Sequence, residues 1–451
     1  MQVSTRLFFL AFLFAGASAV QGCSASADTV GNSSQAVTQA TSDDDDQLTS
    51  DGDNNVEKTL YVWTSDQARQ EPDMVVVINF NPKSRNYGKI VTTVPVPPPG
   101  NVGNEAHHCH VSADKTVLAC GGLLSLLRND DDIFLFDIKD ARHPRYMYSL
   151  RATQSHITDD FLPLPGGGFL ITDMGSATGG APGRVVELAP DYKTIIAEYP
   201  TVDPADGSEW VGSFNPHGID GDIARNILVT SDLVNPVTTL NAWSGPIELH
   251  SSVRYWDLAH RTITRSIFIP NDNGGTMDVK LIPHDPHGRA ITASMFTGLV
   301  YTVDPTDGSY VQSFDCENIV PHVEVPVPGG MTQLLAMPKS GTRVLFASFQ
   351  AGQVGMLDIT NPTSFSQVAV VSLGLGAGPH DIDLTEDDSR LVVTDYFLNE
   401  DDFGKIHYEG DHKVHVIDVT ENSLTVDPKF GEIDFNTAFG TPKRPHGIAM
   451  K

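Results

Sequence analysis

The sequence predicts an all-β fold, a seven-bladed β-propeller whose last blade is closed by strands from the N- and C-terminal parts of the chain. Three observations support this prediction. Short apolar or alternating runs, separated by glycine, proline and aspartate, dominate the 451 residues, and helical patterns are scarce. A Pro-His phrase recurs at intervals of several tens of residues, which is typical of a repeat architecture. The last such phrase, at Pro445-His446, opens a lone strand at the end of the chain.

The clearest repeat unit lies near the C-terminus. One strand opens at Pro379-His380-Asp381, a turn follows at 386–389, and two further strands are predicted at 391–395 and 414–419. Consecutive antiparallel strands of this kind form a four-stranded meander, which is the unit of a propeller blade. The same order of strands and turns therefore serves as the template for the rest of the chain.

The other blades are located by their first strands. The repeat spacing of about 50 to 65 residues is longer than a minimal blade and indicates inserted loops. Strands at 60–64, 74–80 and 90–94 lack a first strand of their own. Pairing them with the last strand would complete a seventh blade and remove the open sheet edges. The first strands are expected near His108, His156, His217, Met277, Met331 and His446.

The N-terminal part has the features of an export signal. Residues 1–22 combine a charged start, an apolar core and small residues at 17–19, which together indicate a secretory signal peptide. The stretch that ends in Cys23 also resembles a lipobox, so plain secretion and lipidation of Cys23 are both predicted. Residues 23–56 are polar and acidic, which predicts a disordered tether before a propeller at 57–451. We expect a secreted or periplasmic protein without a membrane span, or a membrane-anchored lipoprotein.

Charge and motifs exclude several functions. The formal net charge of −28 argues against a nucleic-acid partner, which requires a basic surface. The sequence contains no nucleophile elbow, phosphate-binding loop or dinucleotide fingerprint. Catalytic residues are therefore not assigned from motifs.

The recurring histidines predict a metal site. In a propeller the first strand of each blade is innermost, so residues that lead into it should converge near the axis. Neutral imidazoles suit copper, zinc, iron and nickel. The alternative is structural, with each histidine stabilising its own turn. The residues expected to converge are His107, His108, His156, His217, His380 and His446, and the carboxylates expected to orient them are Asp159, Asp160, Asp220 and Asp381.

Cys109 and Cys120 flank a predicted hairpin almost symmetrically, which indicates a cross-strand disulfide. The alternative is that Cys109 is a thiolate ligand of the metal. Strand alternation opposes this alternative, because Cys109 would point away from His108 and His110.

Several motifs carry a family resemblance. The stretch from Asn79 to Gly88, followed by the His107-His108 pair, resembles the start of the selenium-binding protein and methanethiol oxidase family. Other motifs follow in the family's order to the C-terminus, namely Ser155-His156, Val253-Arg254-Tyr255-Trp256-Asp257, Ile282-Pro283-His284-Asp285-Pro286, Asp358-Ile359-Thr360-Asn361-Pro362 and the closing His446.

The resemblance implies a seven-bladed propeller that binds copper and oxidises methanethiol with dioxygen and water to formaldehyde, hydrogen sulfide and hydrogen peroxide. By position it implies ligands at His107, His108, His156, His284 and His446. Strand geometry opposes His284, which it places in a turn at the far end of a first strand. The cysteine-rich segment of the animal proteins is missing here, whereas His217 and His380 are additional, and this indicates a divergent branch.

Three functions follow from these observations. The first is a copper-dependent oxidase of small thiols, with a thiol and dioxygen as substrates. The second is a non-enzymatic extracytoplasmic propeller that binds a ligand or a protein. The third, a lactonase or hydrolase with a hard cation, requires axial Glu, Asn and Asp residues that the predicted first strands do not show.

Overall fold

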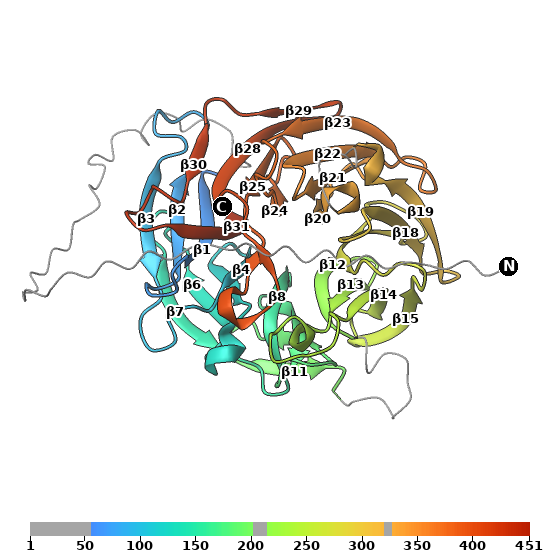
Figure 1. Cartoon of the computed structure of the whole chain (residues 1–451), viewed down its shortest axis with the longest axis horizontal. Coiled ribbons are helices and arrows are strands. Elements are labelled where there is room, and N and C mark those ends of the chain that lie inside the picture. Colours follow the sequence, from blue (N-terminus) through green and yellow to red (C-terminus); the bar gives the residue numbers. More distant parts are fainter. Residues whose placement is uncertain (1–55, 202–213, 320–326) are drawn as a thin grey trace, which may run out of the picture. The chain divides into compact units, whose positions relative to one another are not determined.

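The protein is described by a computed structural model that covers residues 56–201, 214–319 and 327–451. Seven antiparallel sheets surround a central axis (Figure 1), and this part of the chain contains no α-helix. Six sheets have four strands, and one has a fifth strand at its margin. The predicted seven-bladed β-propeller is therefore confirmed.

Each blade begins at the axis and is built outward. The innermost strands, in blades 1 to 7, are β4 (Ala106–Val111), β8 (Ser155–Pro163), β12 (Pro216–Asp222), β16 (Thr276–Leu281), β20 (Thr332–Ala336), β24 (Asp381–Leu384) and β31 (Lys443–Met450). The second strands are β5 (Val117–Gly122), β9 (Phe169–Ser176), β13 (Ile227–Val234), β17 (Ala290–Ser294), β21 (Arg343–Ser348), β25 (Arg390–Thr394) and β1 (Thr59–Asp66).

Two further layers complete the blades. The third strands are β6 (Ile133–Asp137), β10 (Arg184–Leu188), β14 (Leu249–Asp257), β18 (Leu299–Asp304), β22 (Gln353–Asp358), β28 (Lys413–Thr420) and β2 (Met74–Asn79). The outermost strands are β7 (Arg145–Leu150), β11 (Ile195–Tyr199), β15 (Thr262–Phe268), β19 (Ser309–Asp315), β23 (Ser366–Ser372), β29 (Ser423–Val426) with β30 (Glu432–Asp434), and β3 (Ile90–Pro95).

The two ends of the propeller sequence meet in blade 7. Strand β31 pairs antiparallel with β1, and Leu60 lies opposite Met450. Strands β1, β2 and β3 are the three that the sequence predicted without a first strand of their own. All side chains of β1 and β31 are buried, so this closure contributes to the core and removes two free edges.

The same β-bulge occurs in six of the seven innermost strands. In β4, His107 and His108 together lie opposite the single residue Gly121. Comparable shifts occur in β8, β12, β16, β20 and β31. A bulge adds one residue to a strand and changes the direction of the side chains beside it. These bulges determine which side chains face the axis.

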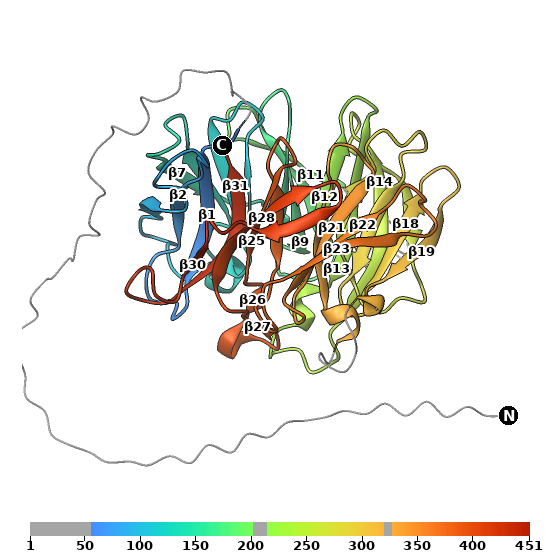
Figure 2. The ribbon, with the colours of Figure 1, turned by 90° about the horizontal axis from the view of Figure 1, so that it is seen from above.

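An insertion between β25 and β28 lies at the end of the propeller opposite the C-terminus (Figure 2). We call residues 396–410 the cap insertion. It contains the short strands β26 (Leu398–Asn399) and β27 (His407–Tyr408), and the backbone amide of Lys405 donates to the carbonyl of Thr239 over 2.9 Å. The 3₁₀ turns are η2 (Ser125–Arg128), η3 (Pro236–Thr238), η4 (Cys316–Asn318), η5 (Pro328–Gly330) and, in the cap insertion, η6 (Asp401–Phe403).

The predicted signal peptide, Cys23 and nearly all of the predicted tether lie outside the described residues, so these predictions stay predictions. Within the described residues, no helix has the length and apolar character needed to cross a membrane.

Candidate metal centre

Five imidazoles meet at the axis of the propeller. We call them the histidine cluster, which consists of His107, His108, His217, His380 and His446. The ring centroids of His107 and His446 are 4.2 Å apart, and those of His107 and His108 are 4.3 Å apart. None of the five residues is more than 4% exposed. The side chains of four different blades thus form one buried group.

The bulges explain this convergence. The first residue of each bulge occupies the same position relative to the second strand of its blade. His380, which directly precedes β24, occupies the corresponding position in blade 6. We call these seven positions the axial ring. Blades 4 and 5 contribute Met277 and Gln333 to it, and blade 2 contributes a carboxylate. The axial ring consists of His107, Asp159, His217, Met277, Gln333, His380 and His446.

Asp159 is the anion of the histidine cluster. Its Oδ2 atom lies 3.2 Å from His107 Nε2 and 3.2 Å from His217 Nε2, and its Oδ1 atom lies 3.1 Å from His108 Nδ1. The side chain of Asp159 is fully buried. Two sets of donor atoms come within 4.8 Å of one another and could each hold a metal ion. They are His107 with His108 and His446, and His107 with Asp159 and His217.

The donor atoms of the cluster have few partners in the protein. Neither ring nitrogen of His107, His108 or His446 makes a hydrogen bond, although all six atoms are buried. An unpartnered buried polar atom costs about 1 to 3 kcal/mol, so this many at one point are expected only where a ligand binds. The donor set therefore fits a metal ion that prefers imidazole.

Gln333 orients one member of the cluster. Its Oε1 atom lies 2.8 Å from His380 Nδ1, which leaves His380 Nε2 buried and without a partner. Because an amide oxygen only accepts, Nδ1 of His380 donates and Nε2 carries the free lone pair. Gln333 therefore fixes the orientation of His380 and leaves Nε2 as the nitrogen that could bind a cation.

The cluster is mostly neutral. Burial lowers the pKa of His217 to about 4, and burial together with neighbouring imidazoles lowers the pKa of His107, His380 and His446. Burial also opposes protonation of His108, but the carboxylate of Asp159 outweighs it and raises the pKa of His108 to about 9. Neutral imidazoles are the form that binds metal.

Comparisons with known proteins identify the family. A family profile described as the 56 kDa selenium-binding protein (SBP56) matches residues 48–451. The chain belongs to this family. A methanethiol oxidase of Hyphomicrobium sp is 23% identical over 332 residues, which cover 70% of this chain and 71% of that protein. A methanethiol oxidase of Ruegeria pomeroyi is 22% identical over 330 residues, covering 68% and 71%.

A solved structure shares the fold. A hypothetical selenium-binding protein from Sulfolobus tokodaii superposes with a TM-score of 0.69 at 18% identity, over 88% of this chain and 94% of that one. The predicted family is thereby confirmed, and the structural likeness independently supports the propeller fold.

Two predicted ligands of this SBP56 family member lie outside the cluster. His156 precedes the bulge of β8 by three residues, and its Nδ1 atom pairs with Asp132 Oδ2 over 2.6 Å. Asp159 occupies the axial position that the sequence assigned to His156. His284 lies in an exposed turn beyond the far end of β16, with a φ of 63°, as strand geometry predicted. Neither residue belongs to the two donor sets.

The carboxylates predicted to orient imidazoles divide into two groups. Asp159 contacts three members of the cluster, as described above. Asp160 lies 3.1 Å from His110 Nε2, a residue that the sequence analysis did not select. Asp220 and Asp381 instead accept hydrogen bonds from the backbone of the next blade, at 2.7 and 2.9 Å.

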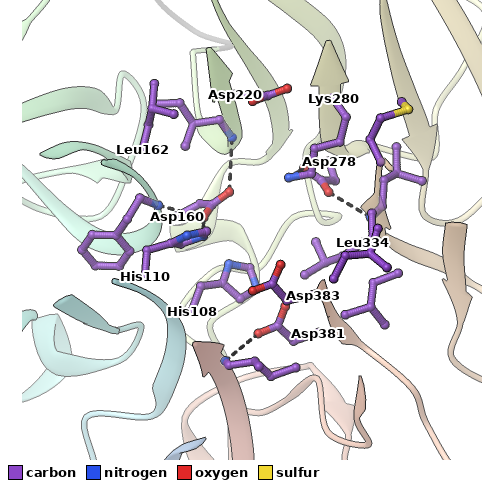
Figure 3. Close-up of a pocket in the computed structure, with 18 of the residues that line it drawn as sticks. His108, His110, Asp160, Leu162, Asp220, Asp278, Lys280, Leu334, Asp381 and Asp383 are labelled. Carbon is purple, nitrogen blue, oxygen red and sulfur yellow. Dashed lines mark hydrogen bonds and ion pairs between the residues drawn. The ribbon is translucent and has the colours of Figure 1, made fainter. Parts of the chain in front are cut away.

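A wide channel leads away from the cluster toward the end of the propeller where the inner strands finish. We call it the acidic channel. It encloses about 700 Å³, and His108 lies at its base. Figure 3 shows the carboxylates of Asp160, Asp278 and Asp383 in its wall, with Lys280 beside Asp278. Its wall also contains His284.

A smaller, largely apolar pocket lies on the side of the cap insertion. We call it the apolar pocket, and its volume is about 50 Å³. His107, His217 and Asp159 contribute its polar wall, and Phe397 and Ile406 of the cap insertion contribute to its apolar wall. The histidine cluster is therefore bordered by the acidic channel on one side and by the apolar pocket on the other.

Cys109 is not a metal ligand, because it forms a disulfide with Cys120. The two cysteines are directly opposite each other in β4 and β5. The disulfide interpretation is therefore confirmed, and the thiolate interpretation is wrong. The buried Cys316 is the only free cysteine among the described residues.

Proposed function

We propose that this SBP56 family member is a copper-dependent oxidase of small thiols that converts methanethiol, dioxygen and water to formaldehyde, hydrogen sulfide and hydrogen peroxide. The observation that carries the proposal is the group of buried imidazole nitrogens that make no hydrogen bond in the protein. The relatives named methanethiol oxidase support the choice of reaction.

The donor set and the reaction together favour copper. Imidazole suits copper and zinc alike, but zinc has no redox chemistry and would not support an oxidation. Bound copper would supply the electron transfer between the thiol and dioxygen. His107, His108 and His446 would hold it, with the carboxylate of Asp159 close enough to balance part of its charge.

The residues around the cluster have separate tasks. The apolar pocket has room for only a few heavy atoms, so it accepts a methyl group and excludes larger polar compounds. Nδ1 of His217 is buried without a hydrogen bond beside this pocket, so it is available to contact a bound thiol. The acidic channel, which is lined by several charged side chains, provides a route to solvent for polar products such as hydrogen peroxide.

Metal analysis and oxygen uptake test the proposal together. The full chain is loaded with copper, freed of excess metal and assayed for methanethiol-dependent oxygen consumption. About one copper per chain is expected from the single cluster, together with methanethiol-dependent oxygen uptake. Absence of bound copper, or bound copper without such uptake, would overturn the proposal and favour the non-enzymatic binding platform.

We also propose that the protein is exported. The features of residues 1–22 support this, and so does the Cys109–Cys120 disulfide, because disulfides persist in oxidising compartments. Cell fractionation and the intact mass of the mature chain test it. A full-length chain in the cytoplasmic fraction would overturn it, and a lipid-sized mass increase on a chain that begins at Cys23 would decide for lipidation.

A further inference from the structure

A second cluster of metal-binding side chains lies in blade 6, away from the axis. It consists of Asp395, Asp411 and His415, and we call it the blade 6 triad. Asp395 follows directly after the second strand β25, Asp411 precedes the third strand β28, and His415 lies within β28. The triad is therefore separated from the innermost strand of its blade and shares no residue with the histidine cluster.

The triad has the spacing of a coordination site. One donor atom from each residue lies within 4.8 Å of the other two. Nε2 of His415 lies 2.9 Å from Oδ2 of Asp395. Two ligands that are each about 2.1 Å from one metal ion, at a right angle, are about 3 Å apart. The observed separation of 2.9 Å is close to this value.

The protein leaves these donor atoms unsatisfied. Asp395 is fully buried, and neither of its carboxylate oxygens accepts a hydrogen bond of normal geometry. Oδ1 of Asp411 and Nε2 of His415 are also buried without a hydrogen bond. A buried carboxylate whose only side-chain ion pair is with one imidazole is incompletely satisfied, and a bound cation removes that cost.

The charges nearby do not balance the triad. The lysine that pairs with the triad is Lys413, whose Nζ atom lies 3.4 Å from Asp411 Oδ2 and 3.3 Å from Glu432 Oε1. Lys413 therefore divides its charge between two carboxylates and does not contact Asp395. Two carboxylates and one imidazole remain for a divalent cation.

The position of the triad gives the site a structural role. Asp395 and Asp411 flank the cap insertion, so a metal ion between them would join its two ends. The two ends already run close together, because the amide of His412 donates to the carbonyl of Asp395 over 3.0 Å. A Cβ atom at Gly410 would lie only 2.4 Å from that carbonyl oxygen. The cap insertion in turn forms part of the apolar pocket beside His107 and His217.

We propose that the blade 6 triad binds a divalent cation of the Zn²⁺ or Mn²⁺ class, which fixes the two ends of the cap insertion over the histidine cluster. One imidazole with two carboxylates suits these borderline ions better than soft Cu(I) or the all-oxygen sites of Ca²⁺. The site is separate from the proposed copper centre, and it can exist whether or not the protein oxidises thiols.

Binding of Mn²⁺ tests the site directly. The full chain is titrated with Mn²⁺ while electron paramagnetic resonance reports the free ion. Asp411→Asn is expected to weaken the binding of one Mn²⁺ by at least about tenfold, since loss of even an indirect partner costs that much. His446→Gln, which alters only the histidine cluster, and Glu432→Gln, which removes a neighbouring carboxylate outside the triad, should both retain this binding.

Three results would overturn the proposal. They are no Mn²⁺ or Zn²⁺ binding by the wild type, equal binding by wild type and Asp411→Asn, and loss of binding in His446→Gln alone. Asp411 is partly exposed and is the ligand whose replacement least disturbs the core, so folding should survive. Thermal unfolding of the metal-free variant verifies this, and His415→Gln provides a second ligand variant.

Hydrogen exchange tests the structural role. In the wild type, saturating Mn²⁺ should slow amide exchange in residues 396–410 by at least about threefold, because binding stabilises the folded form of its site. In Asp411→Asn the same addition should leave the exchange unchanged. Equal exchange with and without Mn²⁺ in a wild type that binds the ion would remove the proposed link between the triad and the cap insertion.

Discussion

At one end of the central channel, the innermost strands present imidazoles, and several of their buried nitrogens make no hydrogen bond. Directly after the axial ring, the innermost strands of blades 4 and 6 present carboxylates that accept hydrogen bonds from backbone amides. Asp278 accepts from Leu335 N over 2.9 Å, and Asp381 accepts from Ile448 N over 2.9 Å. Each of these carboxylates reaches from the innermost strand of one blade to that of a neighbouring blade.

The comparison separates two uses of buried polar groups. A buried carboxylate that accepts backbone hydrogen bonds is satisfied within the fold, and it connects two blades. A buried imidazole nitrogen that makes no hydrogen bond is not stabilised by the fold alone, and a ligand is expected to satisfy it. We therefore expect substitutions at the histidine end to remove metal and activity, and substitutions at the carboxylate end to reduce stability.

The largest expected effect is that of His107→Ala, because His107 belongs to both donor sets. Copper affinity and methanethiol-dependent oxygen uptake should fall by more than about 100-fold, since even indirect partners of a ligand cost 10- to 100-fold. Metal analysis and an oxygen electrode measure both quantities. Both quantities are expressed per folded chain, because removing this buried imidazole also leaves a cavity beside Asp159.

The matched control for this experiment is His110→Ala. His110 lies three residues further along the same strand and contacts Asp160 in the acidic channel. It should retain copper. Equal loss of copper in both variants would show that the distinction between the two ends is incorrect.

Asp278→Ala should have the next largest effect, on stability. It removes the acceptor for the amides of Leu335 and Val279, at 2.9 and 2.7 Å, and the partner of Lys280 at 3.2 Å. The free energy of unfolding should fall by about 2 to 3 kcal/mol, because buried donors are left unsatisfied. Urea denaturation measures it. Copper content per folded chain should stay at the wild-type value, and its loss would mean that the carboxylate end contributes to the metal site.

The two ends should also respond to pH in opposite directions. Burial lowers the pKa of His217 to about 4, below its usual value near 6.5, so the unfolded chain binds the proton more readily between these values. The stability from neutral His217 is complete above pH 6.5 and is lost as the pH falls toward 4. In metal-free protein this amounts to roughly 2 kcal/mol between pH 7 and pH 5.

Burial raises the pKa of Asp383 to about 6, and there the sign is reversed. The folded chain holds that proton more readily, so this contribution is complete below about pH 3.8 and is lost as the pH rises through 6. Urea denaturation at pH 5 and pH 7 measures both contributions. His217→Gln should lose less stability than the wild type on going to pH 5, whereas Asp383→Asn should lose less on going to pH 7. Shifts of the same sign would contradict the comparison.

Much of the fold could be predicted from the sequence because its signals are local. Runs of short strands and the recurring Pro-His phrase located the blades, and the lone strand at His446 indicated the closure in blade 7. The meeting of histidines from separate blades then followed from the propeller geometry alone. These inferences require only the order of strands and the rule that first strands line the axis.

The details of the site could not be predicted, because they depend on the bulges. A bulge is a matter of pairing between strands and has no clear signature in a single sequence. Regular alternation therefore gave no reason to select Asp159 over His156 in blade 2, or Gln333 over Met331 in blade 5. The blade 6 triad was missed for another reason, since its members are brought together only when the ends of the cap insertion meet.

The smallest expected effect tests whether the thiol binds in the apolar pocket or approaches through the acidic channel. Ile406→Ala removes apolar contact from the wall of the apolar pocket and should raise KM for methanethiol by about fourfold, which corresponds to roughly 0.8 kcal/mol for one methylene-sized contact. It should also improve the relative rate with ethanethiol, because the pocket is enlarged. Leu334→Ala makes the same kind of change in the wall of the acidic channel and should leave KM unchanged. Steady-state oxygen uptake with both thiols measures these effects. If Leu334→Ala instead altered KM while Ile406→Ala did not, the thiol would approach through the acidic channel, and the apolar pocket would serve only to shield the histidine cluster from water.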